Sequence, residues 1–352
     1  MAPGKQRNKS AVNSYNDERL FGISYIVPNH LLSIFSVCLS LAMLVAPTYS
    51  HATRNDKTNI SPYRGGEHYS GSLLTYTSNN SRVYALVATP TQARKKYPVI
   101  IANHGNHPNP PQYGITKDGA DWRPGDYYRK IPSAFTARGF IVVMPDYRGH
   151  NKSAGGEVAK GFLATHFYAQ DVLSLLPHIP NIPLVDPEQI YMWGHSMGGD
   201  VTLRALRQTD SIKAASIWST VGGDIWEQAY YYSRARTSTL THTPPTKDLM
   251  GELKQDLARY PQIDWQQNEP LLNLDKISVE LQIHHALGDQ STAYDWSRQL
   301  AAKLSYMEKT YKFYSYSGAD HLFTGQQFDQ AVSRDVKFFS RHDTSLAVTI
   351  PK

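Results

Sequence analysis

The stretch QIYMWGHSMGGDVTLRALRQ (189–208) is the strongest indication of the fold in this sequence. A strand-like apolar run leads into the pattern G-x-S-x-G, and an amphipathic helical run follows it. The pattern alone arises by chance, but between a strand and a helix it is typical of a sharp turn that exposes a reactive serine. The glycines let the strand and helix approach closely, and the helix N-terminus favours developing negative charge. We therefore predict that Ser196 is a nucleophile; the alternative is a surface serine in a glycine-rich turn.

A serine hydroxyl is a weak nucleophile until a base removes its proton, so a histidine is expected nearby. His321 lies five residues after the end of the strand-like run YKFYSY (311–316). That position places it on a loop at the carboxyl edge of a parallel sheet, where ligands bind in open α/β folds. His284 and His285 lie within a predicted strand, and His342 lies near the C-terminus. His321 is therefore the predicted base.

An acid must orient that histidine and stabilise its charged form. Asp289 lies four residues beyond the predicted strand in LQIHHALGDQS (281–291). The chain order serine, acid, histidine also agrees with a nucleophile at a strand-to-helix turn. Asp320 is the alternative, although an immediate neighbour of the histidine usually points elsewhere. Asp275 and Asp295 are interpreted as a turn residue and a helix-surface residue.

The negative charge that develops on a carbonyl oxygen needs two backbone donors. The first predicted donor is the amide of Met197, directly after the nucleophile. The second is expected in the loop after the predicted strand Pro98–Asn103, and Asn106 is the candidate. The stretch 104–110 contains two histidines, but its spacing matches no zinc pattern. We therefore predict no metal and no cofactor.

The rest of the chain alternates between short apolar runs and helical runs from about residue 70 onward. This alternation predicts an α/β fold with a mostly parallel central sheet of about eight strands flanked by helices. The predicted strands are Ser72–Tyr76, Val83–Ala88, Pro98–Asn103, Phe140–Met144, Ile190–Trp193, Ala214–Trp218, Glu280–His285 and Tyr311–Tyr316. The first two are expected to form an antiparallel pair.

One segment, at about 221–276, is longer than a single crossover needs and is rich in aromatic residues. We interpret it as a helical insertion of one or two helices over the sheet. Trp226, Tyr230 and Tyr231 follow a strand end near the expected site, so they are candidates for a substrate-pocket wall. The alternative is that they pack the insertion onto the body of the domain.

The first 52 residues are interpreted separately, because Leu31–Ala46 is an apolar run followed by small residues that suit cleavage after Ala52. Residues 1–52 are predicted to be a signal peptide, and 53–352 the catalytic domain, exported to the periplasm or secreted. The polar segment before the run is long for a signal peptide, so an anchor formed by residues 31–46 is the alternative, with a buried core helix as a third. The single cysteine, Cys38, lies in this leader, so the remaining chain can form no disulfide.

Composition excludes several classes of protein. The 352 residues are 41% hydrophobic and 19% charged, which is typical of a globular protein. The formal net charge is +6, but no run of basic residues concentrates it. A nucleic-acid partner is therefore not expected, and a membrane contact is expected only through the possible anchor. The oligomeric state stays open.

Taken together, these motifs resemble the α/β-hydrolase superfamily, and more narrowly its prolyl oligopeptidase-type and dienelactone hydrolase-like branch. The resemblance extends from about Tyr76 to Phe339. It rests on five motifs in the correct order: YPVIIANHG (97–105), ARGFIVVMPDYRGHNKSAGG (137–156), IYMWGHSMGG (190–199), HHALGDQSTAYDWS (284–297) and YSGADHLF (316–323). It implies that Asp146, Arg148 and Gly149 have a chiefly structural role.

Two departures from the peptidases of that branch bear on function. The chain has no room for the β-propeller that gates them, and Met197 stands where they tend to have an aromatic residue. Both features favour a serine hydrolase that cleaves a small carboxylic ester through an acyl-enzyme. The alternative is a prolyl oligopeptidase-like serine peptidase acting on short peptides, and the second alternative is a non-catalytic binding module on the same fold.

Overall fold

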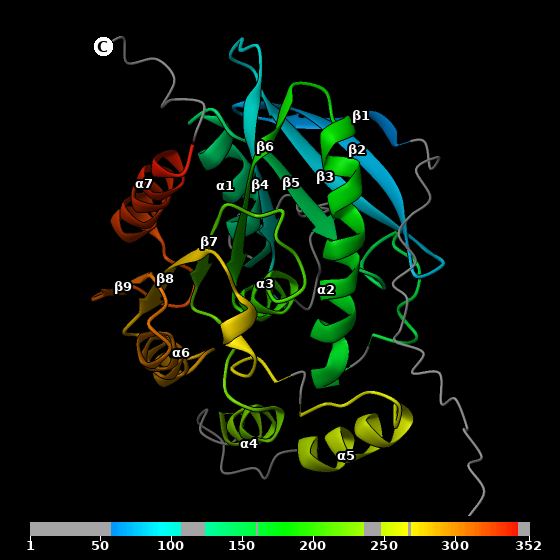
Figure 1. Cartoon of the computed structure of the whole chain (residues 1–352), viewed down its shortest axis with the longest axis vertical. Coiled ribbons are helices and arrows are strands. Elements are labelled where there is room, and N and C mark those ends of the chain that lie inside the picture. Colours follow the sequence, from blue (N-terminus) through cyan, green and yellow to red (C-terminus); the bar gives the residue numbers. More distant parts are fainter. Residues whose placement is uncertain (1–57, 107–123, 160, 236–247, 267–268, 344–352) are drawn as a thin grey trace, which may run out of the picture. The chain divides into compact units, whose positions relative to one another are not determined.

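The protein is described by a computed structural model, which covers residues 58–106, 124–159, 161–235, 248–266 and 269–343 (Figure 1). The chain divides into two units, Met1–Ser50 and His51–Lys352, and every element described below belongs to the second. The predicted signal peptide or anchor and its cleavage point lie outside the described residues. Among the residues that are described, no helix has the length and apolarity needed to cross a membrane.

A single mixed sheet forms the centre of the second unit. Its strands are β1 (Asn59–Gly66), β2 (Tyr69–Ser78), β3 (Ser81–Pro90), β4 (Tyr97–Asn103), β5 (Ile141–Asp146), β6 (Val185–His195), β7 (Ala214–Trp218), β8 (Glu280–Ala286) and β9 (Tyr311–Tyr316). Their order is β1-β2-β3-β5-β4-β6-β7-β8-β9. The pairs from β5 to β9 are parallel, and β1, β2 and β3 join antiparallel. The predicted α/β fold is confirmed, with nine strands in place of about eight because β1 was not predicted.

The central parallel strands are buried on both faces, which explains their continuous apolar sequences, whereas the edge strand β9 is only partly buried. Every residue of β4, β5 and β7 is buried. In register, Asn103 of β4 lies beside Gly194 of β6, and His195 lies beside Trp218 of β7. Parallel strands end at one shared edge, so the loops that follow β4, β6, β7, β8 and β9 meet there. All the predicted catalytic residues lie on or beside these loops.

Helices cover both faces of the sheet, as Figure 1 shows. Their bounds are α1 (Pro124–Thr136), α2 (Ala164–Leu175), α3 (Met197–Leu206), α4 (Ile225–Ala235), α5 (Leu249–Arg259), α6 (Tyr294–Tyr306) and α7 (Gly325–Arg341), with short 3₁₀ helices η1 (Gly161–Leu163), η2 (Leu176–Asn181) and η3 (Leu274–Lys276). Apolar residues of α2, α3 and α6 share one core cluster with the sheet, and those of α1 and α7 share another. The molecule therefore has three layers, with one apolar core on each side of the sheet.

The predicted helical insertion is confirmed for its described residues, where it contains α4 and α5. These two helices lie side by side at the lower edge of Figure 1. They share a small core of their own, whose buried members are Leu163, Ile225, Ala229 and Leu253. The helices α4 and α5 thus pack against each other through these apolar contacts. They lie beyond the edge of the sheet at which the candidate site is found.

A buried carboxylate ties α7 into the middle of the sheet. Asp335 of α7 is fully buried. Its Oδ1 accepts hydrogen bonds from Ser216 Oγ at 2.6 Å, Gln282 Nε2 at 2.7 Å and His284 Nε2 at 2.9 Å, and its Oδ2 accepts one from Trp218 Nε1 at 2.8 Å. Four donors on β7 and β8 therefore converge on one side chain, although the Trp218 indole also reaches Ser216 Oγ at 3.1 Å, and a buried donor without an acceptor is costly.

Candidate active site

Ser196 occupies the strained turn that the sequence predicts. Its backbone has φ 57° and ψ −124°, in a region that residues with a side chain rarely adopt. Three hydrogen bonds hold it there: the Ser196 amide donates to Trp218 O at 2.9 Å, and its carbonyl accepts from the amides of Gly199 at 3.0 Å and Val221 at 3.1 Å. Neighbouring strand ends thus fix the conformation that presents the hydroxyl.

Close backbone packing around Ser196 requires glycine at two positions. A Cβ on Gly198 would overlap the carbonyl oxygen of Asn103 at the end of β4. A Cβ on Gly105 would lie 2.9 Å from the Cβ of Ser196, nearer than real side chains approach. The loop after β4 therefore runs directly against the nucleophile, as expected for a loop that supplies a donor to the reacting group.

His321 and Asp289 meet at the same edge of the sheet. His321 Nδ1 donates to Asp289 Oδ2 at 2.8 Å; the acid side chain is fully buried and the histidine side chain is 16% exposed. A carboxylate can only accept, so Nδ1 carries the proton and Nε2 is left as an acceptor. That is the tautomer that a general base for a serine hydroxyl requires.

The carboxylate of Asp289 is held by several donors in addition to His321. Its Oδ1 accepts from the amides of Ser291 at 2.8 Å and Thr292 at 2.9 Å, and its Oδ2 lies 3.4 Å from His285 Nε2. Burial alone would raise the pKa of Asp289, but the close contact with His285 and the hydrogen bond from His321 outweigh it and hold this pKa well below its usual range. The acid therefore stays ionised wherever the fold persists.

The alternative acids and bases have other partners. Asp320 is exposed, and its Oδ1 accepts from the Leu322 amide at 3.0 Å, which closes a turn. His284 bonds to Asp335 on the far side of β8 from the site. Asp295 pairs with Arg298 on the surface of α6 at 3.0 Å. Geometry thus separates these side chains from the pair formed by Asp289 and His321.

The two predicted backbone donors belong to the turn of the nucleophile and to the loop after β4, whose Gly105 lies against Ser196. Met197 is the first residue of α3, where amides lack helical partners. On the opposite loop, the Gly105 amide already donates to the hydroxyl of Tyr128 at 2.8 Å. The next residue, Asn106, therefore remains the candidate for the second amide, and the assignment of Met197 and Asn106 as donors stays a prediction.

The three aromatic residues proposed for a pocket wall differ in environment. Trp226 and Tyr230 are 39% and 55% exposed on α4. Tyr231 packs against Trp296 of α6, with ring centroids 4.9 Å apart. Burial and the nearby charge of Asp289 raise the pKa of Tyr231. Tyr231 therefore joins the insertion to the body while lying within electrostatic reach of the acid.

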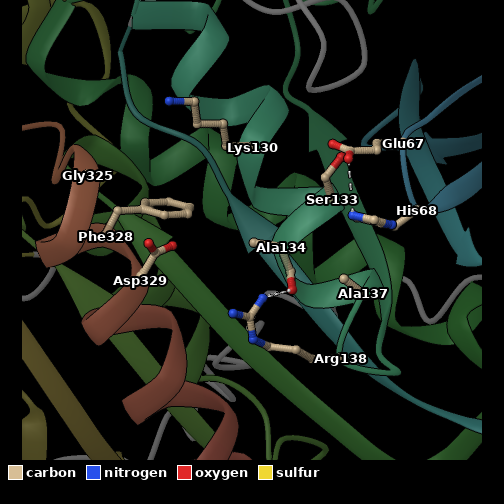
Figure 2. Close-up of a pocket in the computed structure, with 10 residues that line it drawn as sticks. All are labelled: Glu67, His68, Lys130, Ser133, Ala134, Ala137, Arg138, Gly325, Phe328 and Asp329. Carbon is tan, nitrogen blue, oxygen red and sulfur yellow. Dashed lines mark hydrogen bonds and ion pairs between the residues drawn. The ribbon is translucent and has the colours of Figure 1, made fainter.

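A surface depression of about 360 Å³ lies elsewhere, between α1 and the start of α7 (Figure 2). Charged side chains, among them Lys130, Arg138 and Asp329, surround it, and the ion pair of Glu67 and His68 closes one side. Ser196, Asp289 and His321 are not among its lining residues. In the described ranges, moreover, no three metal-binding side chains gather as a metal ion would require.

Two further residues touch the candidate site and were not predicted to have a function. His195 lies inside the G-x-S-x-G motif, so the sequence offers a signal for it. Tyr128 of α1 has no such signal, because only the tertiary structure brings it beside Gly105. His285, considered in the sequence only as a base, instead lies against the acid.

A serine at a strained strand-to-helix turn, with a buried Asp–His pair at the same edge of a sheet of this order, is the arrangement of the α/β-hydrolase class, and the protein is a serine hydrolase of that class. The family model of the prolyl oligopeptidase family matches residues 127–344. The chain belongs to that family.

Individual relatives are distant. The uncharacterized peptidase YtmA of Bacillus subtilis is 25% identical over 253 residues, which cover 71% of this chain and 85% of YtmA. The lysophosphatidylserine lipase ABHD12 of Danio rerio is 29% identical over 115 residues, 33% of this chain and 25% of the lipase. The chain covers 42% of the length of two Escherichia coli proteins of 31.7 kDa that it also matches.

Among solved structures, the acylaminoacyl peptidase of Pyrococcus horikoshii superposes with a TM-score of 0.58 at 18% identity. The match covers 78% of this chain and 42% of that peptidase. At this identity the likeness shows the shared fold alone.

Proposed function

We propose that the protein is a serine peptidase that cleaves short peptides or aminoacyl amides. The observation that carries the proposal is the buried pair of Asp289 and His321, with the Nδ1 proton fixed, at the sheet edge that presents Ser196. Membership of the prolyl oligopeptidase family favours an amide bond over an ester. The relative YtmA, which is named as a peptidase, supports the same choice.

The proposed reaction is a two-step acyl transfer. Ser196 Oγ attacks the carbonyl carbon while His321 Nε2 takes the hydroxyl proton, and Asp289 stabilises the resulting imidazolium. The oxyanion accepts hydrogen bonds from the amides of Met197 and Asn106. His321 then gives its proton to the leaving amine, and a water molecule activated by His321 releases the acid and restores the serine.

A carboxylesterase is the second candidate, and two observations favour it. ABHD12 is a lipase, and Met197 follows the serine where an aromatic residue is usual in the larger peptidases. The same residues would carry out the chemistry, because fold and triad leave the leaving group undefined. The two candidates differ in substrate rather than in mechanism.

Parallel turnover of amides and esters tests the proposal. Purified full-length protein and its Ser196→Ala variant would be assayed on aminoacyl and dipeptidyl nitroanilides and on nitrophenyl esters of increasing acyl length. Cleavage of nitroanilides that disappears in the variant is the expected result. Ester cleavage with nitroanilides untouched would select the esterase, and turnover that persists in Ser196→Ala would contradict both.

We also propose that the chain is exported, because the apolar run 31–46 precedes a small-residue cleavage point at Ala52. N-terminal sequencing of the protein recovered from cell fractions tests this proposal. A mature chain that begins after Ala52 is expected in the exported fraction. An intact N-terminus in the membrane fraction would instead select the anchor.

A further inference from the structure

A chain of buried hydrogen bonds runs through the residue that precedes the nucleophile. The Gly105 amide donates to the Tyr128 hydroxyl at 2.8 Å, and that hydroxyl lies 2.7 Å from His195 Nδ1. On the other side of the ring, His195 Nε2 lies 2.8 Å from the carbonyl oxygen of His321. His195 is fully buried and Tyr128 is 2% exposed, so water does not compete for these contacts.

The chemistry of the end groups sets the direction of every bond. The carbonyl oxygen of His321 can only accept, so His195 Nε2 must carry a proton. A neutral imidazole then has an unprotonated Nδ1, which accepts the proton of the Tyr128 hydroxyl. The hydroxyl oxygen remains free to accept from the Gly105 amide. One tautomer of one histidine therefore satisfies the whole chain.

The surroundings favour this neutral state. Burial, together with nearby His321, lowers the pKa of His195 well below its usual value. Burial likewise raises the pKa of the Tyr128 phenol, so its proton stays in place. His195 also packs on the His321 ring, with centroids 4.6 Å apart. The contact thus fixes both the backbone and the ring of the predicted base.

The geometry points to His195 and Tyr128 as positioning residues that lock the loop carrying the Asn106 amide and the loop carrying His321 onto the nucleophile turn as one unit. Gly105 is the neighbour of Asn106, so the bond to Tyr128 anchors the residue directly before the predicted oxyanion donor. The bond from His195 to the His321 carbonyl fixes the base. This inference rests on the proposed serine-hydrolase mechanism and names residues that act through the catalytic groups.

The variant Tyr128→Phe removes one oxygen and breaks the chain in its middle. It leaves the Gly105 amide and His195 Nδ1 without the hydroxyl while the ring still fills its space. Displacement of a catalytic group by about 1 Å can cost about a hundredfold in rate. We therefore expect kcat to fall between tenfold and about a hundredfold, with KM changed less than about twofold.

Tyr316→Phe is a matched control. The Tyr316 hydroxyl lies 2.7 Å from the Nδ1 of another buried histidine, His284, whose Nε2 bonds to Asp335 and not to a catalytic loop. Both substitutions remove a buried tyrosine hydroxyl from a histidine, so both are expected to lower the melting temperature. Only Tyr128→Phe is expected to lower kcat.

Substitutions of the histidine separate its two bonds. The amide of asparagine in His195→Asn can reach the position of Nδ1 and retain Tyr128, whereas the amide of glutamine in His195→Gln can reach the position of Nε2 and retain the His321 carbonyl. Each variant is expected to keep part of the rate that His195→Leu loses.

The readouts are the rate of covalent labelling of Ser196 by a fluorophosphonate, kcat and KM on the best substrate, and melting temperature, for the full-length chain. A fall in labelling rate and kcat for Tyr128→Phe but not for Tyr316→Phe supports the inference. Equal losses in the two variants, or a Tyr128→Phe rate within twofold of the wild type, would overturn it while leaving the proposed function intact. A wild-type protein that neither labels nor turns over would overturn the proposed function, and the inference with it.

Discussion

Replacing Asp289 with asparagine exchanges one oxygen for an NH₂ group, and the structure determines which oxygen. Oδ1 accepts from the amides of Ser291 and Thr292, so an NH₂ group at that position would face two donors. The amide oxygen must therefore take the place of Oδ1, and the NH₂ group takes the place of Oδ2. Oδ2 is the atom that now accepts from His321 Nδ1 and from the Thr292 hydroxyl, and an imidazole or a hydroxyl, unlike a backbone amide, can also act as an acceptor.

The NH₂ group would then donate to His321 Nδ1, which must lose its proton to accept. The proton moves to Nε2, the nitrogen that has to receive the Ser196 proton. A histidine held in this tautomer is no longer a base for the serine, and in serine proteases the corresponding change lowers kcat by about 10⁴-fold. We expect a loss of that order near neutral pH, with little change in fold because the shape of the side chain is kept.

The labelling rate of Ser196 with a fluorophosphonate measures this loss without knowledge of the substrate. Asp320→Asn is the matched control, since Asp320 adjoins the same histidine but bonds only to a turn amide among the contacts described above. We expect its rate to stay within about twofold of the wild type. A loss of less than tenfold in Asp289→Asn, or a comparable loss in Asp320→Asn, would refute the assignment of the acid.

Three further substitutions test other parts of the structure. Burial raises the pKa of Glu269 to about 7, and its carboxylate accepts from the Ile225 amide at the start of α4. The unfolded chain releases this proton near pH 4.5 and the folded chain only near 7, so this group lowers stability as pH rises between these values. Glu269→Gln should therefore gain stability relative to the wild type across that window in urea unfolding, and a difference that does not vary with pH would contradict this. The amide oxygen in Asp335→Asn can face the three donors that now bond to Oδ1, but the NH₂ group then faces the Trp218 indole N–H. We therefore expect the free energy of unfolding to fall by about 2 kcal/mol. A fall of less than about 0.5 kcal/mol would argue against the role of the carboxylate. Gly105→Ala places a methyl group against the nucleophile and against the buried Tyr128 hydroxyl, so we expect labelling to slow about a hundredfold and the melting temperature to fall; labelling at the wild-type rate would show that the loop can move aside.

The parts of the site that the sequence predicts are those that depend on local geometry. A serine between a strand and a helix has to lie in a tight turn, and loops after parallel strands have to share one edge. These two constraints were sufficient to choose Asp289 and His321, and the structure brings the two side chains together at 2.8 Å. The insertion was predictable for a similar reason, because its length exceeds that of a crossover.

The chain of hydrogen bonds from Gly105 through Tyr128 and His195 to His321 could not be predicted, because its residues come from segments that only tertiary packing brings together. Nothing in the sequence around Tyr128 differs from an ordinary amphipathic helix. The same holds for Asp335, which resembles a surface residue of the last helix until the sheet is in place around it. Strand β1 was missed because its residues are largely exposed, so it lacks the apolar pattern by which the other strands were found.

The position of Asp335 along the chain has a consequence for synthesis. The nine strands that the structure describes all precede Asp335 in the sequence. The four buried donors on β7 and β8 are therefore synthesised before the carboxylate that accepts from them. The hydrogen bonds of β7 and β8, the strands next to the acid and the nucleophile, therefore cannot all form as the strands are synthesised. They form only when α7 packs against the sheet. Activity of this hydrolase should therefore appear only after α7 has packed against the sheet, wherever in the cell the chain folds.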